Sequence, residues 1–260
     1  MSSPLLKENQ NITGSGRNHG IDLLRLVLMF MVCMLHTLGQ GGILNASAEG
    51  TNAYRAYWFL EILSYCAVDG FAIISGYAAS NRPRKYDKIV NMWFQAFFYS
   101  FILTGVLTVI GISDSWATDD MIKCIFPITF NKFWYFTDFF ALFFAIPVLN
   151  KFLFSISEEV AKKALIIIFV LFSVLGIFND SFRTAGGYSA IWLIVLYCIG
   201  VLAKRVKLFE TRKNTTLIIL WGLCIFITWL VHDRSGNMQL ISYVSPTILL
   251  SGMIMVVLFS

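Results

Sequence analysis

The sequence predicts an all-α, polytopic helical membrane protein with about eight transmembrane helices. Of the 260 residues, 57% are hydrophobic and 13% are charged, and the mean hydropathy is +0.71. Soluble globular domains contain about 25% charged residues, so this chain has too few charged side chains to cover a soluble surface. Its apolar residues also gather in repeated stretches close to the roughly 20 residues that cross a bilayer.

Hydropathy places these segments at residues 20–39, 57–79, 90–111, 133–153, 162–178, 188–203, 215–231 and 239–259. We therefore expect a polar, cytoplasmic N-terminal segment at residues 1–19 and one transmembrane domain at residues 20–260. Because the chain stops at Ser260 beside an apolar stretch, we expect a truncated protein without its C-terminal helices.

The distribution of basic residues supports this map, because cytoplasmic loops of membrane proteins collect Lys and Arg. With the N-terminus in the cytoplasm, the inner segments hold fourteen of the 20 Lys and Arg residues and the outer segments hold five. The five outer ones are Arg55, Lys123, Lys132, Arg183 and Arg234. The remaining residue, Arg25, lies inside the first segment. These counts predict a multi-pass protein of the cell membrane with a cytoplasmic N-terminus.

Composition also excludes some chemistry. The five cysteines form no C-x-x-C pair and no spaced set with histidine, so we expect neither a disulfide framework nor a metal site. The net charge of +5 is explained by the inner loops, and we expect no nucleic-acid partner.

Two ionisable residues interrupt the first apolar segment. Arg25 and His36 are eleven residues apart, about three helical turns, so both lie on one helix face about 16 Å apart along the axis. Such residues inside a membrane face the bundle interior, water or a ligand. Histidine is the usual general base, and the guanidinium fork suits phosphate. The predicted orientation puts Arg25 toward the cytoplasm and His36 toward the outside.

Acidic residues in the next segment offer partners for these two groups. Glu61 lies near the outer end of the second segment and Asp69 lies near its middle. Either acid could orient His36, and depth favours Glu61. Asp69 could equally neutralise Arg25 in a purely structural salt bridge. His36 could instead have a structural role, in which its ring packs against a backbone carbonyl of a neighbouring helix.

The second segment is followed by a predicted cytoplasmic loop that is rich in cations. Arg82, Arg84 and Lys85 lie in it, close to the membrane face that Arg25 occupies. Membrane topology alone accounts for such a loop. The functional alternative is a site for an anionic, phosphate-bearing cofactor that enters from the cytoplasm.

These motifs together resemble the acyltransferase-3 family of integral membrane acyltransferases. The resemblance rests on Arg25-x10-His36, on residues 68–77 (VDGFAIISGY) and the basic loop, and it continues through Trp134-Tyr135 and residues 187–193 (GYSAIWL). Family members typically have about ten helices and move an acyl group, commonly acetyl from acetyl-CoA, onto extracytoplasmic carbohydrate. The resemblance implies that His36 acts in the transfer and that Arg25 supports the acyl donor. The family often has Arg-x-x-Arg after its second helix, whereas this chain has Arg82-x-x-Lys85.

Residues 35–44 (LHTLGQGGIL) further resemble the membrane portion of membrane-bound serine racemases from vancomycin-resistance clusters, where this domain is associated with serine uptake. Two classes of function therefore stay open. The first is an O-acyltransferase that uses cytoplasmic acetyl-CoA and acetylates a hydroxyl of a carbohydrate or another cell-envelope acceptor, with His36, Glu61 and Asp69 as catalytic residues. In this class His36 could take the proton from the acceptor hydroxyl or could carry the acyl group, and the sequence does not separate the two mechanisms. The second is a transporter for a small polar molecule such as serine, since intramembrane ionisable residues also line translocation paths. A membrane anchor without activity is a third alternative.

Overall fold

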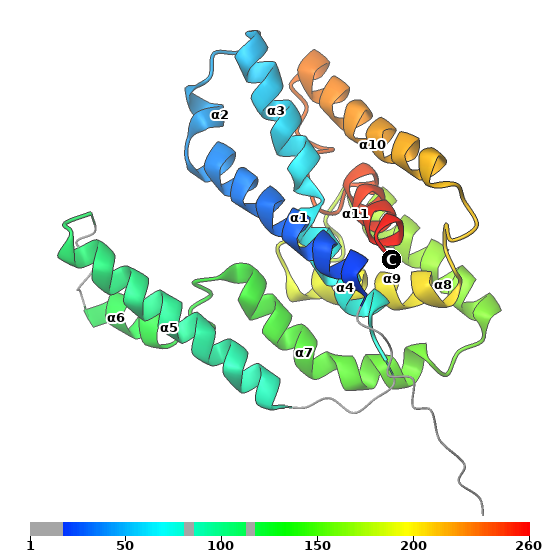
Figure 1. The fold of residues 1–260 in the computed structure, drawn as a ribbon, viewed down its shortest axis with the longest axis horizontal. Coiled ribbons are helices and arrows are strands. Elements are labelled where there is room, and N and C mark those ends of the chain that lie inside the picture. The colour runs from blue at the N-terminus through cyan, green and yellow to red at the C-terminus, as the bar shows by residue number, and fades with distance from the viewer. Residues whose placement is uncertain (1–17, 81–85, 113–117) are drawn as a thin grey trace, which may run out of the picture.

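A computed structural model describes residues 18–80, 86–112 and 118–260 of the chain. Side chains are described in the same ranges, except at residues 118–120. Within these ranges the chain is helical without β-strands, which confirms the predicted all-α class. In chain order the helices (Figure 1) are α1 (His19–Leu35), α2 (Ile43–Ala46), α3 (Asn52–Tyr65), α4 (Ala67–Tyr77), α5 (Asp87–Val109), α6 (Thr118–Ile125), α7 (Trp134–Leu153), α8 (Glu158–Phe169), α9 (Ala190–Arg205), α10 (Asn214–Ser235) and α11 (Pro246–Leu258). Short π-helices extend α1 (η1, His36–Gln40) and α8 (η2, Val170–Val174), and a 3-10 turn (η3, Ala185–Gly187) precedes α9.

Five helical segments in the described part of the chain are long and apolar enough to cross a membrane. They are His19–Gln40, Asn52–Tyr77, Asp87–Val109, Trp134–Leu153 and Asn214–Ser235. The other three predicted segments coincide with α8, α9 and α11, which are shorter. A polytopic helical protein is therefore confirmed, and the count of eight spans stays a prediction. Most of the predicted N-terminal segment lies outside the described residues.

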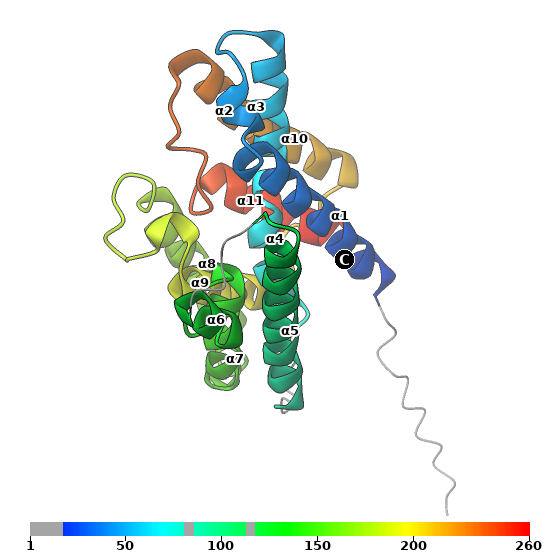
Figure 2. The same ribbon diagram turned by 90° about the vertical axis from the view of Figure 1, so that its left-hand side faces the viewer.

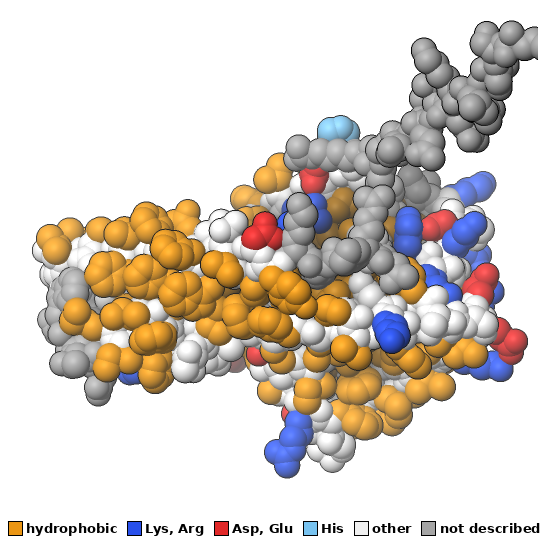
Figure 3. Space-filling view, turned by 90° about the horizontal axis from the view of Figure 1, so that it is seen from below, with side chains coloured by type: hydrophobic (Ala, Val, Ile, Leu, Met, Phe, Trp, Pro, Cys, Tyr) orange, Lys and Arg blue, Asp and Glu red, His pale blue; other side chains and the backbone are white. Residues whose placement is uncertain are grey.

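Much of the surface is apolar, as a bilayer requires. Helix α5 is largely exposed, with Phe94 59% and Leu103 53% accessible. Figure 3 shows apolar side chains spread over one face of the molecule, with many charged side chains gathered at one end.

Helix α4 lies at the centre of the bundle and is almost entirely buried. It packs against α1, α9 and α11 (Figures 1 and 2), while α7 and α8 cover α9 and α10 covers α3 and α11. The largest fully buried side chains include Trp192 and Tyr197 on α9.

Two glycines allow α4 and α9 to cross at close range. A Cβ atom on Gly76 would collide with the carbonyl oxygen of Tyr197, and one on Gly200 would collide with the carbonyl oxygen of Ile73. Small residues at a helix crossing are the usual way to bring backbones together inside a membrane. Gly76 and Gly200 therefore set how closely α4 and α9 approach each other.

The crossing predicts a specific stability defect. Replacing Gly200 with alanine should lower the free energy of unfolding by about 1–3 kcal/mol, because the new methyl group meets backbone atoms that cannot move aside. The thermal unfolding midpoint of the detergent-purified chain measures the effect. Gly222→Ala is the matched control, since a Cβ there meets nothing within 4 Å. Equal midpoints for the two variants would contradict this account of the crossing.

Candidate active site

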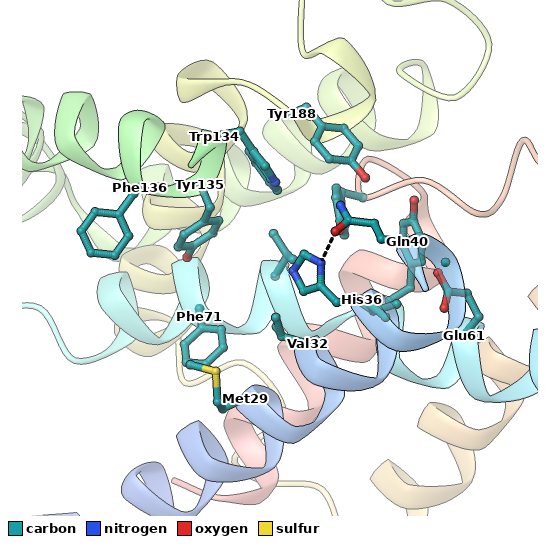
Figure 4. Close-up of a pocket in the computed structure, with 15 residues that line it drawn as sticks. Met29, Val32, His36, Gln40, Glu61, Phe71, Trp134, Tyr135, Phe136 and Tyr188 are labelled. Atoms are coloured by element: carbon teal, nitrogen blue, oxygen red, sulfur yellow. Dashed lines mark hydrogen bonds between the residues drawn. The ribbon is translucent and has the colours of Figure 1, made fainter. Parts of the chain in front are cut away.

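A cavity of about 520 Å³ opens between α1 with η1, α3, α4 and the start of α7. Its walls are mostly apolar and aromatic, with His36, Gln40 and Glu61 as the polar side chains besides tyrosine (Figure 4). The lining residues are Met29, Val32, Leu35, His36, Gly39, Gln40, Glu61, Tyr65, Val68, Phe71, Trp134, Tyr135, Phe136, Tyr188 and Tyr243. An apolar pocket with a few converging polar groups is the usual form of a ligand site.

His36 is the first residue of the π-helix η1 at the end of α1. π-helical turns are rare and often occur at functional sites. In this turn the amide nitrogen of Gly41 donates to the carbonyl oxygen of His36 at 2.8 Å. The ring nitrogen Nδ1 of His36 lies 2.8 Å from Oε1 of Gln40 (Figure 4). Since this amide oxygen can only accept, Nδ1 carries the proton, and Nε2 of the neutral ring has a lone pair for chemistry.

Glu61 lines the same cavity from α3. Its side chain is 8% exposed, and its Oε2 atom is buried without a hydrogen-bond partner among the described residues. The nearest part of η1 is Gly39, where an added Cβ would lie 3.5 Å from Oε1 of Glu61. The structure thus brings Glu61 and His36 to one cavity, but the hydrogen bond that orients the His36 ring comes from Gln40 and not from Glu61.

Asp69 is fully buried behind the wall of the cavity. Its Oδ1 atom accepts a 3.0 Å hydrogen bond from Nε1 of Trp192, which ties α4 to α9. It lies near enough to Tyr65 and Tyr135 to interact with them electrostatically. Neither alternative expected from the sequence is formed in this structure, because Asp69 is paired with neither His36 nor Arg25. Its bond to Trp192 gives it a structural role, and a catalytic role stays a prediction.

Arg25 lies on α1 with a half-exposed side chain and forms a 2.9 Å ion pair with Asp22. It lines a second cavity of about 230 Å³, together with Phe71, Ser75, Tyr135, Phe136 and others. Phe71, Tyr135 and Phe136 also line the His36 cavity, so the two cavities adjoin. The cations predicted to assist Arg25 (Arg82, Arg84 and Lys85) lie outside the described residues.

A third cavity of about 610 Å³ adjoins His36 on another side. His36 and Gln40 border it, as do Tyr135 and Phe136, and Lys132 lies at its wall. Tyr135 and Phe136 therefore line all three cavities. The three cavities therefore adjoin one another around these two residues, with Arg25 at one cavity, His36 at the other two and Lys132 at the wall of the last.

Four aromatic rings form a wall of the His36 cavity, and sequence reasoning missed their assembly. The ring centroids of Trp134 and Tyr188 are 4.6 Å apart, those of Tyr188 and Tyr243 are 5.0 Å apart, and those of Tyr65 and Tyr243 are 4.7 Å apart. The four residues come from α3, α7, the turn before α9 and the segment before α11. The signal that the sequence holds is Gly186-Gly187 before Tyr188, because paired glycines favour a turn, and the structure has the turn η3 there.

The turn that presents Tyr188 is fixed by contacts on both sides. Gly187 has φ of +104°, and a Cβ there would collide with Tyr243, so only glycine fits. The Asp180 carboxylate accepts hydrogen bonds from the Thr184 hydroxyl at 2.6 Å and from the amides of Thr184 and Ala185. Burial alone would raise the pKa of Asp180, but these hydrogen bonds together outweigh it and lower the pKa.

Nearly the whole chain matches one protein family. The family of the acyltransferase domain, acyltransferase-3, matches residues 18–260. The chain therefore belongs to this family and is a membrane acyltransferase, as its motifs predicted. No curated protein and no solved structure matches the chain.

The lowered pKa of Asp180 predicts a pH-dependent stability of this turn. Because the folded state binds the Asp180 proton more weakly than the unfolded state does, the stabilisation is present above the ordinary pKa of about 4 and is lost as the pH falls through the folded value. The thermal unfolding midpoints of wild type and Asp180→Asn should differ at neutral pH and converge as the pH falls toward about 3. A difference that stays constant with pH would contradict this role.

Proposed function

We propose that the protein is an integral membrane O-acyltransferase that moves an acetyl group from acetyl-CoA on the cytoplasmic side to a hydroxyl of a carbohydrate or another cell-envelope acceptor on the outer side. The observation that carries this proposal is the cavity lined by His36, which shares lining residues with the Arg25 cavity and with the cavity bordered by Lys132. A reaction between substrates from opposite faces of a membrane needs such a shared site. The positive-inside charge distribution supports the direction.

The donor would enter from the Arg25 side. A guanidinium is suited to phosphate, and the Arg25 cavity continues along Phe71, Tyr135 and Phe136 into the His36 cavity. These apolar walls suit the extended pantetheine arm of CoA, whose phosphates would remain near Arg25 and the basic loop that follows α4. The thioester would then reach His36.

The Nε2 atom of His36 would act as the general base. It takes the proton from the acceptor hydroxyl while the hydroxyl oxygen attacks the thioester carbonyl carbon. The new carbon–oxygen bond forms as the carbon–sulfur bond breaks, and the proton passes from Nε2 to the sulfur of CoA. Gln40 would position the ring, because its side-chain oxygen accepts the hydrogen bond from Nδ1 and leaves Nε2 for the acceptor hydroxyl.

The function is tested by acetyl transfer with a substituted His36. Membranes that contain the full chain are supplied with radiolabelled acetyl-CoA, and label is counted in the surface glycans. His36→Ala should reduce the rate by at least about 100-fold, because it removes the base. The matched control is His19→Ala, which removes an exposed histidine from the first turn of the same helix and should keep the rate.

Both variants must be recovered folded from detergent in equal yield for the comparison to hold. Label that is unaffected by His36→Ala would contradict the mechanism. Uptake of serine that His36→Ala abolishes, without any acetyl transfer, would identify a transporter instead.

A further inference from the structure

The His36 cavity has two unlike sides. Figure 4 places Tyr135 and Phe136 on one side of His36 and Glu61 on the other. The side of Tyr135 and Phe136 continues into the Arg25 cavity and is the proposed donor route. The opposite side, around Glu61, Tyr65 and Tyr188, belongs to the His36 cavity alone among the cavities described above.

Glu61 is the acidic residue of this second side. Its side chain is more than nine-tenths buried, and the Oε2 atom has no hydrogen-bond partner in the described part of the chain. A buried carboxyl oxygen that no protein donor reaches is costly to leave unpaired. A ligand that brings a positive charge or a donor would remove this penalty.

Aromatic faces surround the same space. Tyr65 lies one helical turn after Glu61 on α3, so both side chains are on one helix face. Four rings lie in a row. The ring centroid of Tyr243 is 4.7 Å from that of Tyr65 and 5.0 Å from that of Tyr188. Trp134 lies at the end of the row, with its ring centroid 4.6 Å from that of Tyr188. The negative faces of such rings attract ammonium groups, and aromatic cages of this type bind quaternary amines.

Among the residues that the structure describes, none supplies a permanent cation to this cavity. None of the described residues that line it is Lys or Arg. Arg25 is paired with Asp22 and borders the neighbouring cavity. The carboxyl group and the ring faces therefore act on a ligand without competition from a resident positive charge.

We infer that the acceptor substrate carries an ammonium group near its reactive hydroxyl, as an amino sugar or an amino alcohol does. The ammonium binds between Glu61 and the rings of Tyr65, Tyr188 and Tyr243. The hydroxyl then lies toward Nε2 of His36. The assignment of this ligand as the acceptor rests on the proposed function, whereas the binding of a cation at Glu61 can be measured without it.

The test compares two ligands of the same shape that differ in charge. Choline and 3,3-dimethylbutan-1-ol are titrated into the full chain in detergent, without acetyl-CoA, and binding is followed by calorimetry. Choline should bind about tenfold more tightly than its neutral isostere, in the range expected for a desolvated cation–π site with a carboxylate. Glucosamine should displace choline, and glucose should not.

Two pairs of variants locate the effect. Glu61→Gln should remove the preference for choline, while Glu159→Gln, which removes the same charge from an exposed ion pair on α8, should keep it. Tyr188→Phe retains the ring and should preserve binding, whereas Tyr188→Leu should weaken it.

Equal affinity of wild type for choline and its isostere would overturn the inference, even if every variant failed to fold. A preference that survives in Glu61→Gln would also overturn it.

The result separates this inference from the proposed function. Acetyl transfer that depends on His36, together with no preference for choline, would leave the acyltransferase in place and remove the ammonium site. A preference for choline that depends on Glu61, without acetyl transfer, would leave the cation site in place and remove the reaction.

Discussion

The arrangement of the site depends on the close crossing of α4 and α9 at Gly76 and Gly200. This contact buries α4 at the centre of the bundle and brings Asp69 to Trp192. With α4 fixed in this way, its outward face carries Val68 and Phe71 into the His36 cavity. Helix α1 packs on the same helix, with Leu28 against Gly70, and so places η1 at the cavity wall. The position of His36 therefore follows from a packing constraint rather than from a flexible loop.

The surroundings of four ionisable residues inside the bundle differ, and their roles differ accordingly. Asp69 on α4 accepts a hydrogen bond from Trp192 through Oδ1, and Asp138 on α7 accepts one from the backbone amide of Ala190 at the start of α9, so each joins two helices. The Oδ2 atom of Asp69 is also buried without a partner among the described residues, but Asp69 lines none of the three cavities. His36 and Glu61 face a cavity instead, one with an available ring nitrogen and the other with an unpaired oxygen. Buried polar groups that protein atoms do not satisfy are the ones most suited to a ligand.

Local features of the sequence predicted the fold class and the helix that carries Arg25 and His36. Both features depend on hydropathy and helical period, which can be read from residues that lie close together in the sequence. Gln40, which contacts the His36 ring in this structure, was not among the partners that the sequence suggested. An acid on the next helix seemed favoured by depth, but the π-helical turn brings Gln40 to the ring, and a change of helical period of this kind leaves no trace in composition. The aromatic wall could not be predicted either, because Tyr65 and Tyr243 are far apart in sequence and meet only through tertiary packing. The role of the basic loop stays a prediction.

The central claim is that the adjoining cavities around His36 serve substrates from both faces of the membrane. The most direct test uses the full chain in sealed vesicles of known orientation, with radiolabelled acetyl-CoA only at the cytoplasmic face and an acceptor only at the opposite face. The account predicts that label reaches the acceptor across the intact membrane. Transfer that occurs only when both substrates are on the same face would contradict it.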